Sequence, residues 1–99
     1  MVELAIVWED EAKSQLKQLY YYVKRDSLQN AVSVRNAIIE KVKKAAIYPE
    51  SFSPDKYKTN NDGSYRAFEL DHYRVSYRVT PKEIIILRIR HTSQSPLQF

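Results

Sequence analysis

The chain has 99 residues, of which 43% are hydrophobic and 28% are charged, and it contains one Gly and four Pro. This length suits one domain with one modest core, and the scarcity of Gly and Pro argues against a disordered protein. The absence of Cys excludes disulfides and thiolate metal sites, and no stretch approaches the roughly 20 apolar residues of a membrane span. We therefore expect a single folded domain over residues 1–99, without a signal peptide.

The formal net charge of +4 comes from the second part of the chain. Residues 1–55 hold eight basic and eight acidic side chains, whereas residues 56–99 hold eight basic and four acidic ones. Such a one-sided excess favours an anionic partner, either nucleic acid or an acidic protein segment. On composition alone, a merely solubilising surface explains it equally well.

A strand and a helix are predicted at the start of the chain. Apolar residues alternate over Val2–Trp8, which is typical of a strand. Glu9 and Asp10 then suit a helix start, because acidic side chains accept hydrogen bonds from free backbone N–H groups. Apolar residues recur every three or four positions from there through about Arg25, which predicts an amphipathic helix.

A second helix follows after a short break. Asp26 or Ser27 can cap it, and the helical spacing of apolar residues continues through about Ala46 until Pro49 stops it. The shortness of the break predicts that the two helices form an antiparallel hairpin. Residues 48–64 are predicted to be a polar loop.

Three strands are predicted to close the chain. They cover Tyr65–Leu70, Tyr73–Val79 and Ile84–Ile89, with turns at residues 71–72 and 80–83. Strands that follow one another in sequence usually pair. The sequence therefore predicts an α+β fold of order β-α-α-β-β-β, in which an antiparallel sheet carries the two-helix hairpin on one face.

Arginines recur on one side of the predicted strands. Arg74 and Arg78 alternate with Tyr and Val, so they point away from the helices if the Tyr/Val side is packed. Arg88 and Arg90 share a side of the last strand and can join them in a suitable register, and Arg66 can add to the group. Because guanidinium groups bind phosphates and carboxylates bidentately, we predict a surface that binds an anion or a protein target.

The alternative is a solvated sheet face with cross-strand pairs, such as Glu69 with an arginine. His91 is the candidate for proton transfer near neutral pH, although a lone His is more often structural. Glu69 and Arg66 face opposite sides of one strand, and His91 shares the parity of Leu87 and Ile89, which points it toward the core unless a β-bulge re-aims it. A complete acid–base site is therefore not expected, and no metal or cofactor motif is present.

Four stretches of the chain resemble a known family. They are Glu11-Ala12-Lys13 with the Tyr-rich helix end after it, Tyr65–Leu70, Tyr73–Val79 and Ile84–Pro96. The third contains a Tyr-Arg-x-x-Tyr pattern, and the fourth ends in His-x-x-Gln-x-Pro. Together they resemble the RelE/ParE toxin superfamily of type II toxin–antitoxin systems over nearly the whole chain.

The resemblance implies a bacterial, cytoplasmic toxin that takes part in plasmid stabilization and binds a cognate antitoxin, as a homodimer or in a heterotetramer with it. It implies no cofactor, no metal and no membrane contact. RelE-like members cut mRNA at the ribosome with a basic and Tyr/His/Glu cluster on the sheet, whereas ParE-like members bind and poison DNA gyrase without being enzymes. The long hairpin, from about residue 10 to residue 46, is similar to that of ParE-like members.

Some single positions match the RelE-like nucleases and others depart from them. Arg74 matches an Arg of the RelE-like nucleases that ParE-like members often carry too, and Arg66 matches a basic position of the nucleases. Phe68 stands where the nucleases prefer a second base, and Ser93 stands where many members carry Arg. The resemblance thus favours a gyrase inhibitor. The alternatives are a ribosome-dependent endoribonuclease with Arg66, Arg74 and His91 as catalytic residues, or a decayed toxin that binds only its antitoxin.

Overall fold

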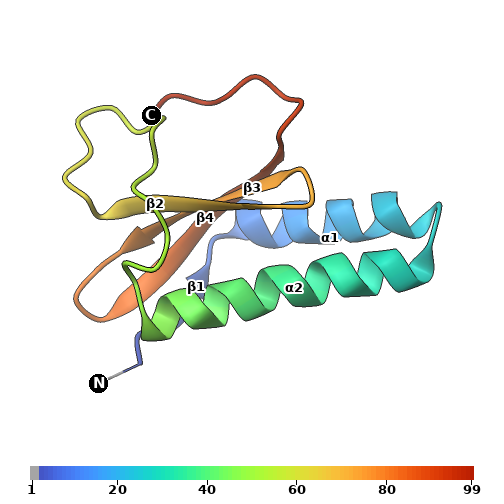
Figure 1. Ribbon diagram of the computed structural model, residues 1–99, viewed down its shortest axis with the longest axis horizontal. Coiled ribbons are helices and arrows are strands. Elements are labelled where there is room, and N and C mark those ends of the chain that lie inside the picture. The colour runs from blue at the N-terminus through green and yellow to red at the C-terminus, as the bar shows by residue number, and fades with distance from the viewer. Residues whose placement is uncertain (1–2) are drawn as a thin grey trace.

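The computed structural model describes residues 3–99 and has the order β-α-α-β-β-β (Figure 1). The elements are β1 (Ala5–Trp8), α1 (Asp10–Lys24), α2 (Leu28–Ile47), β2 (Tyr65–Leu70), β3 (Tyr73–Val79) and β4 (Glu83–His91). This order confirms the predicted α+β fold. Val2, which the sequence places in the first strand, lies outside the described residues. None of the described helices is long and apolar enough to cross a membrane.

The helical hairpin forms where the sequence predicts it. Ser27, not Asp26, caps α2, because its extended backbone lets the side-chain oxygen accept a hydrogen bond from the Asn30 N–H at 3.1 Å. The helix ends at Ile47, directly before the turn that contains Pro49. The two helices lie side by side along one face of the sheet (Figure 1).

The sheet has the strand order β1-β4-β3-β2. The three strands β2, β3 and β4 pair antiparallel, as expected from their order in the chain. The first strand joins the far side of β4 in a parallel ladder, with Ala5 opposite Glu83 and Trp8 opposite Ile86. The sheet is therefore mixed, and the C-terminal strand β4 is central.

The core lies between the helices and the sheet. Tyr77 of β3 is fully buried there, and its hydroxyl donates a hydrogen bond to the Pro49 carbonyl oxygen at 3.1 Å. Burial raises the pKa of Tyr77 to about 12. The other large side chains of this core that are fully buried are Ile38, Val42, Val75, Ile84 and Ile86.

A β-bulge in β4 decides which side chains reach the open face of the sheet, the face opposite the helices. Ser76 pairs with Arg88 but Tyr77 pairs with Ile86, so Leu87 is an extra residue in β4. Strict alternation would put Arg88 on the same side as the buried Ile86. The extra residue reverses the alternation, and the C-terminal part of β4 therefore turns its arginines away from the helices.

Candidate functional site

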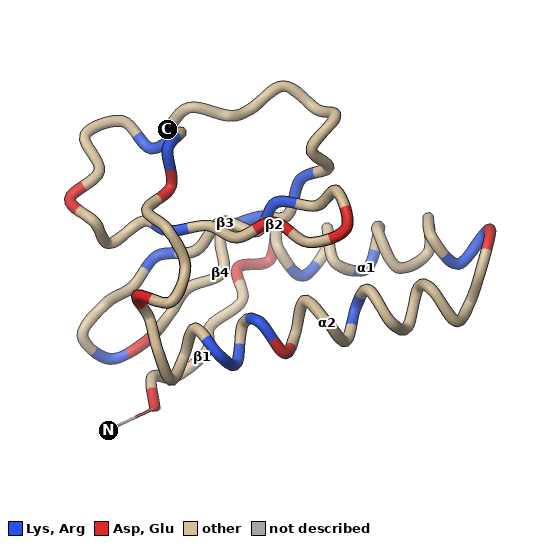
Figure 2. The backbone as a smooth tube through the Cα atoms, viewed as in Figure 1, with Lys and Arg blue, Asp and Glu red and all other residues tan. Residues whose placement is uncertain are grey.

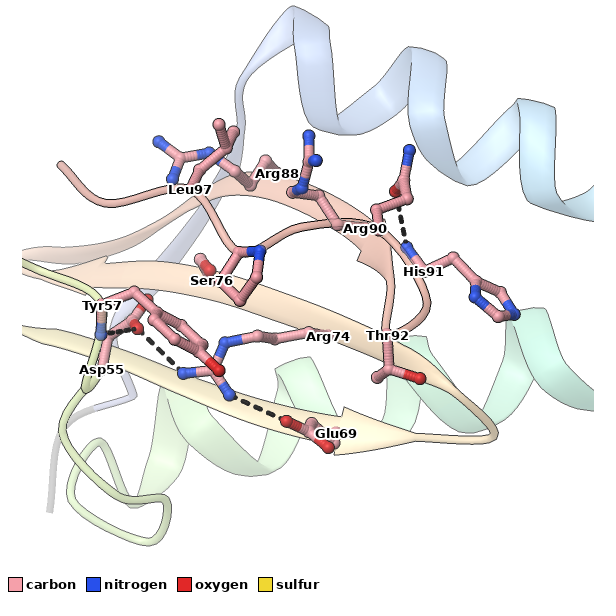
Figure 3. Close-up of a pocket in the computed structure, with 12 residues that line it drawn as sticks. Asp55, Tyr57, Glu69, Arg74, Ser76, Arg88, Arg90, His91, Thr92 and Leu97 are labelled. Carbon is pink, nitrogen blue, oxygen red and sulfur yellow. Dashed lines mark hydrogen bonds and ion pairs between the residues drawn. The ribbon is translucent and has the colours of Figure 1, made fainter.

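Three of the five predicted arginines gather on the open face of the sheet. Arg74 of β3 and Arg88 and Arg90 of β4 line a cavity of about 60 Å³ (Figure 3). They meet there because Arg74 stands opposite Arg90 in the β3–β4 ladder and Arg88 follows the bulge. The remaining walls come from the loop between α2 and β2 and from the segment that follows β4.

Arg74 is held by two carboxylates. Its Nη2 atom lies 2.8 Å from Asp55 Oδ1, and its Nη1 atom lies 3.0 Å from Glu69 Oε2. The guanidinium also covers the Tyr57 ring, with its central carbon 4.8 Å from the ring centroid. The cross-strand pair with Glu69 is the one that the alternative interpretation of the sequence describes, so the charge of Arg74 is already neutralised within the chain.

Asp55 is a site residue that the sequence analysis did not identify. It lies in the predicted loop, and only 2% of it is exposed. Its backbone N–H donates to the Tyr65 carbonyl at 2.8 Å, and its Oδ1 accepts from the Tyr57 N–H at 3.0 Å. The loop thus pairs with the outer edge of β2 and places the Asp55 carboxylate next to Arg74. An isolated Asp in a polar loop gives no sequence signal for such a long-range contact.

Arg88 and Arg90 have a different environment. Among residues 3–99, neither has a carboxylate within 4.0 Å. The guanidinium of Arg88 lies over the ring of Phe99, at 4.1 Å, and Arg90 Nη2 donates to the Ser95 carbonyl oxygen at 3.0 Å. Both charges are therefore covered by the C-terminal segment but not neutralised by it.

The other two predicted arginines lie elsewhere. Arg78 is on the open face opposite Tyr65, with its guanidinium carbon 5.5 Å from that ring, but it does not line the cavity. The prediction that Arg66 joins the group is wrong. Arg66 pairs with the buried Tyr77, and directly opposed residues share a face, so it lies on the helix side and donates to the carbonyls of Phe52 and Gly63.

His91 also lines this cavity, but its ring points away from the arginines. It pairs with Tyr73, whose ring it meets edge-on at 5.2 Å, and it points away from Arg74 and Glu69 (Figure 3). Its Nδ1 atom accepts a hydrogen bond from the Ser93 N–H at 3.0 Å and lies 2.7 Å from the Ser93 hydroxyl. As the parity argument predicts, His91 shares the helix side of the sheet with Tyr73, so its ring and the Glu69 carboxylate point to different sides although both residues line the cavity.

The distribution of charge separates the strands from the C-terminal segment. Basic residues lie along β3 and β4 below that segment, whereas residues 92–99 carry no charged side chain (Figure 2). A basic sheet on a helical hairpin, covered by a neutral segment, is the architecture to be compared with known proteins.

Two solved structures share this architecture. A chain of the chromosomal ParDE toxin–antitoxin system of P. aeruginosa is 24% identical, with a TM-score of 0.69, and the match covers 90% of this chain and 96% of that one. A chain of the RelBE2 toxin–antitoxin complex from Mycobacterium tuberculosis is 16% identical, with a TM-score of 0.64, and the match covers 95% and 97%. The fold is therefore one that occurs in toxin–antitoxin systems.

The sequence assigns the chain to one family. Residues 6–96 match the family model described as the ParE toxin of the type II toxin–antitoxin system parDE. The chain belongs to this family, which confirms the resemblance seen in its strands. No curated protein matches the chain.

Proposed function

We propose that this chain is a non-catalytic toxin that inhibits DNA gyrase by binding to it. Membership of the ParE toxin family supports this choice of target, because gyrase binding is the activity that the resemblance to ParE-like members implies. The proposal that the toxin is non-catalytic rests on one observation: the His91 side chain points away from Glu69 and Arg74.

RNA cleavage through the 2′-hydroxyl needs a group that removes its proton and another that protonates the leaving oxygen. Arg is a poor proton shuttle, because its pKa lies above about 12. Glu69 and His91 are the credible proton carriers, but Glu69 is paired with Arg74 on the open face while His91 packs against Tyr73 on the other. A nuclease centre on either face would lack one of them, which supports binding over catalysis.

We propose in addition that a cognate antitoxin neutralises the toxin. Both solved relatives were determined as toxin–antitoxin systems or complexes. The basic excess of residues 56–99 suits a partner with an acidic segment that folds on binding. Co-expression with the product of the neighbouring reading frame is expected to give a complex that co-purifies, and a chain that remains alone would contradict this pairing.

Two assays with purified protein test the proposed target. In a supercoiling assay with purified gyrase, the chain is expected to inhibit the enzyme. In primer extension on ribosome-bound mRNA, it is expected to leave the message uncut. Discrete cuts that disappear in His91→Ala or Arg74→Ala, but persist in the surface variant Lys17→Ala, would instead assign the chain to the ribosome-dependent endoribonucleases.

A further inference from the structure

The end of the helical hairpin projects beyond the sheet (Figure 1). It is formed by residues 20–35, which run from the last turns of α1 to the first turns of α2, and we call it the hairpin end. Two neighbouring aromatic side chains are open to solvent there, with Tyr21 54% and Tyr22 63% exposed. Burying rings of this size removes a large apolar area from water, so exposed rings are favourable points of contact for a partner. The hairpin end is therefore a candidate binding surface.

Tyr21 is the outer member of a stack of planar groups. The rings of Tyr20 and Tyr21 are nearly parallel, with an interplanar angle of 7° and centroids 5.5 Å apart. The guanidinium of Arg35, from α2, lies over the Tyr20 ring with its central carbon 4.9 Å from the centroid. Lys24 Nζ lies 5.9 Å and 5.7 Å from the centroids of the two rings. Within residues 3–99 no further ring stacks on Tyr21, so its ring is held in place while it stays open to another planar group.

Two basic residues accompany Tyr21 on the same side of α1. Lys24 and Arg25 follow it by three and four positions, a spacing that puts side chains on one face of a helix. Both are exposed, and in the described part of the chain neither has a carboxylate within 4.0 Å. The hairpin end as a whole holds three basic side chains and one acidic one. The exposed ring thus has positive charges beside it that no ion pair of the described residues neutralises.

This combination fits an unpaired nucleic acid better than it fits an acidic protein segment. A nucleobase is planar and can extend the stack on Tyr21, and the phosphates on either side of it are anions for Lys24 and Arg25. An acidic peptide would satisfy the charges but not the ring, because the face of an aromatic ring carries partial negative charge and repels a carboxylate. The bases must be unpaired, because neighbouring base pairs cover the faces of a base inside a duplex.

We propose that the hairpin end binds an unpaired stretch of DNA, with one base stacked on Tyr21 and the adjacent phosphates on Lys24 and Arg25. The inference rests on the proposed function only in taking DNA instead of RNA, because DNA is the substrate of gyrase. It goes beyond that function in giving the toxin a direct contact with nucleic acid, on the helix side of the molecule.

Fluorescence anisotropy with a labelled single-stranded thymidine dodecamer tests the stacking contact in the full chain, Tyr21→Ala, Tyr21→Phe and Tyr48→Ala. Tyr48 is the matched control, because its ring is also 54% exposed but follows the opposite end of α2. Tyr21→Ala is expected to bind about tenfold more weakly than the full chain, because it removes the ring on which the base stacks. Tyr21→Phe keeps the ring, so it and Tyr48→Ala are expected to stay within about twofold of the full chain. Equal affinities of Tyr21→Ala and the full chain would overturn the proposal.

The double variant Lys24→Gln/Arg25→Gln tests the phosphate contacts. It is expected to bind more weakly and to reduce the slope of log affinity against log salt by about 1.4, because each phosphate contact to a single strand contributes about 0.7. An unchanged slope would contradict these contacts. Tighter binding of a uridine dodecamer of RNA would overturn the choice of DNA, and a hexaglutamate peptide that bound with the same dependence on Tyr21 would assign the surface to an acidic protein instead.

Nuclear magnetic resonance on the unmodified chain gives a second readout, which does not depend on the folding of any variant. A base stacked on Tyr21 is expected to shift the proton resonances of that ring upfield, while those of Tyr48 stay unchanged. Unchanged Tyr21 resonances with bound oligonucleotide would place the DNA elsewhere and refute the stacking. Because neither experiment contains gyrase, a chain that inhibits supercoiling without binding the oligonucleotide would overturn this inference alone. A chain that binds the oligonucleotide through Tyr21 without inhibiting supercoiling would support the inference and overturn the proposed function.

Discussion

The two ion pairs of Arg74 differ in what they contribute. The Asp55 side chain is 1% exposed and the Glu69 side chain is 52% exposed. A buried carboxylate that loses its partner is left with an uncompensated charge, whereas an exposed pair is screened by water and contributes little. Arg74 therefore contributes to the stability of the fold as well as to the charge of the open face.

Arg74→Ala is accordingly expected to lower the free energy of unfolding by about 2–4 kcal/mol, because it strands Asp55 in the interior. Glu69→Ala removes only the exposed pair and is expected to cost less than about 1 kcal/mol. Urea unfolding of the two variants beside the unmodified chain measures both effects. Equal losses in the two variants would contradict the dominant role of Asp55. Any loss of activity in Arg74→Ala must be corrected for the folded fraction.

Ionisation of Tyr77 lowers the free energy of unfolding at alkaline pH. Its pKa is raised from 10.0 to about 12 in the folded chain, so the folded state holds this proton more tightly than the unfolded state does. Its contribution is fully present below about pH 10 and is lost as the pH rises toward about 12. Between about pH 9 and about pH 11, the free energy of unfolding is expected to fall by about 1 kcal/mol from this group.

Urea unfolding at the two pH values tests this for Tyr77→Phe against the exposed control Tyr21→Phe. Tyr77→Phe is expected to lose that part of the pH dependence, although it starts from a lower stability because the Pro49 carbonyl loses its donor. Tyr21→Phe is expected to keep it. The same alkaline loss in both variants would show that other tyrosines are responsible.

At the scale of elements, local patterns predicted most of the fold. The periods of apolar residues in the two helices and the alternation in β3 are properties of short stretches, so they were readable from the sequence. The parallel pairing of β1 with β4, the side on which Arg66 lies and the bulge at Leu87 depend on how distant strands meet. No local pattern reports such a register, so these features became visible only in the structure.

The bulge can be tested by deletion. Deleting Leu87 would remove the extra residue and leave Arg88 next to Ile86, so strict alternation would keep Arg88 and Arg90 on the open face. The deletion is therefore expected to keep the fold and to cost less than about 3 kcal/mol, because no unpaired guanidinium group is buried. Leu87→Ala keeps the bulge and is also expected to keep the fold. Thermal unfolding of both variants tests this, and a deletion variant that does not fold would contradict the assignment of Leu87 as the extra residue.

At the scale of the whole molecule, only part of the candidate site could be predicted from the sequence. Strand parity predicted the side of Arg74, whereas Arg88 and Arg90 were expected to join it only in a suitable register, which the bulge supplies. The partners of these arginines come from segments far away in the chain. Asp55 and Phe99 complete the site through contacts that loops make across the sheet. The result is a face whose central arginine is paired with two carboxylates and whose two outer arginines are covered but not paired with a carboxylate.

The proposed function predicts how cells respond to the whole chain. A gyrase inhibitor damages DNA while ribosomes continue to work, whereas a ribosome-dependent nuclease stops protein synthesis. Induced expression in a bacterial host is therefore expected to activate a DNA-damage reporter before the incorporation of radiolabelled methionine declines. Co-expression of the neighbouring gene product is expected to prevent the response. An early loss of incorporation without reporter activity would favour the endoribonuclease, and normal growth with the chain folded and expressed would favour a decayed toxin that binds only its antitoxin.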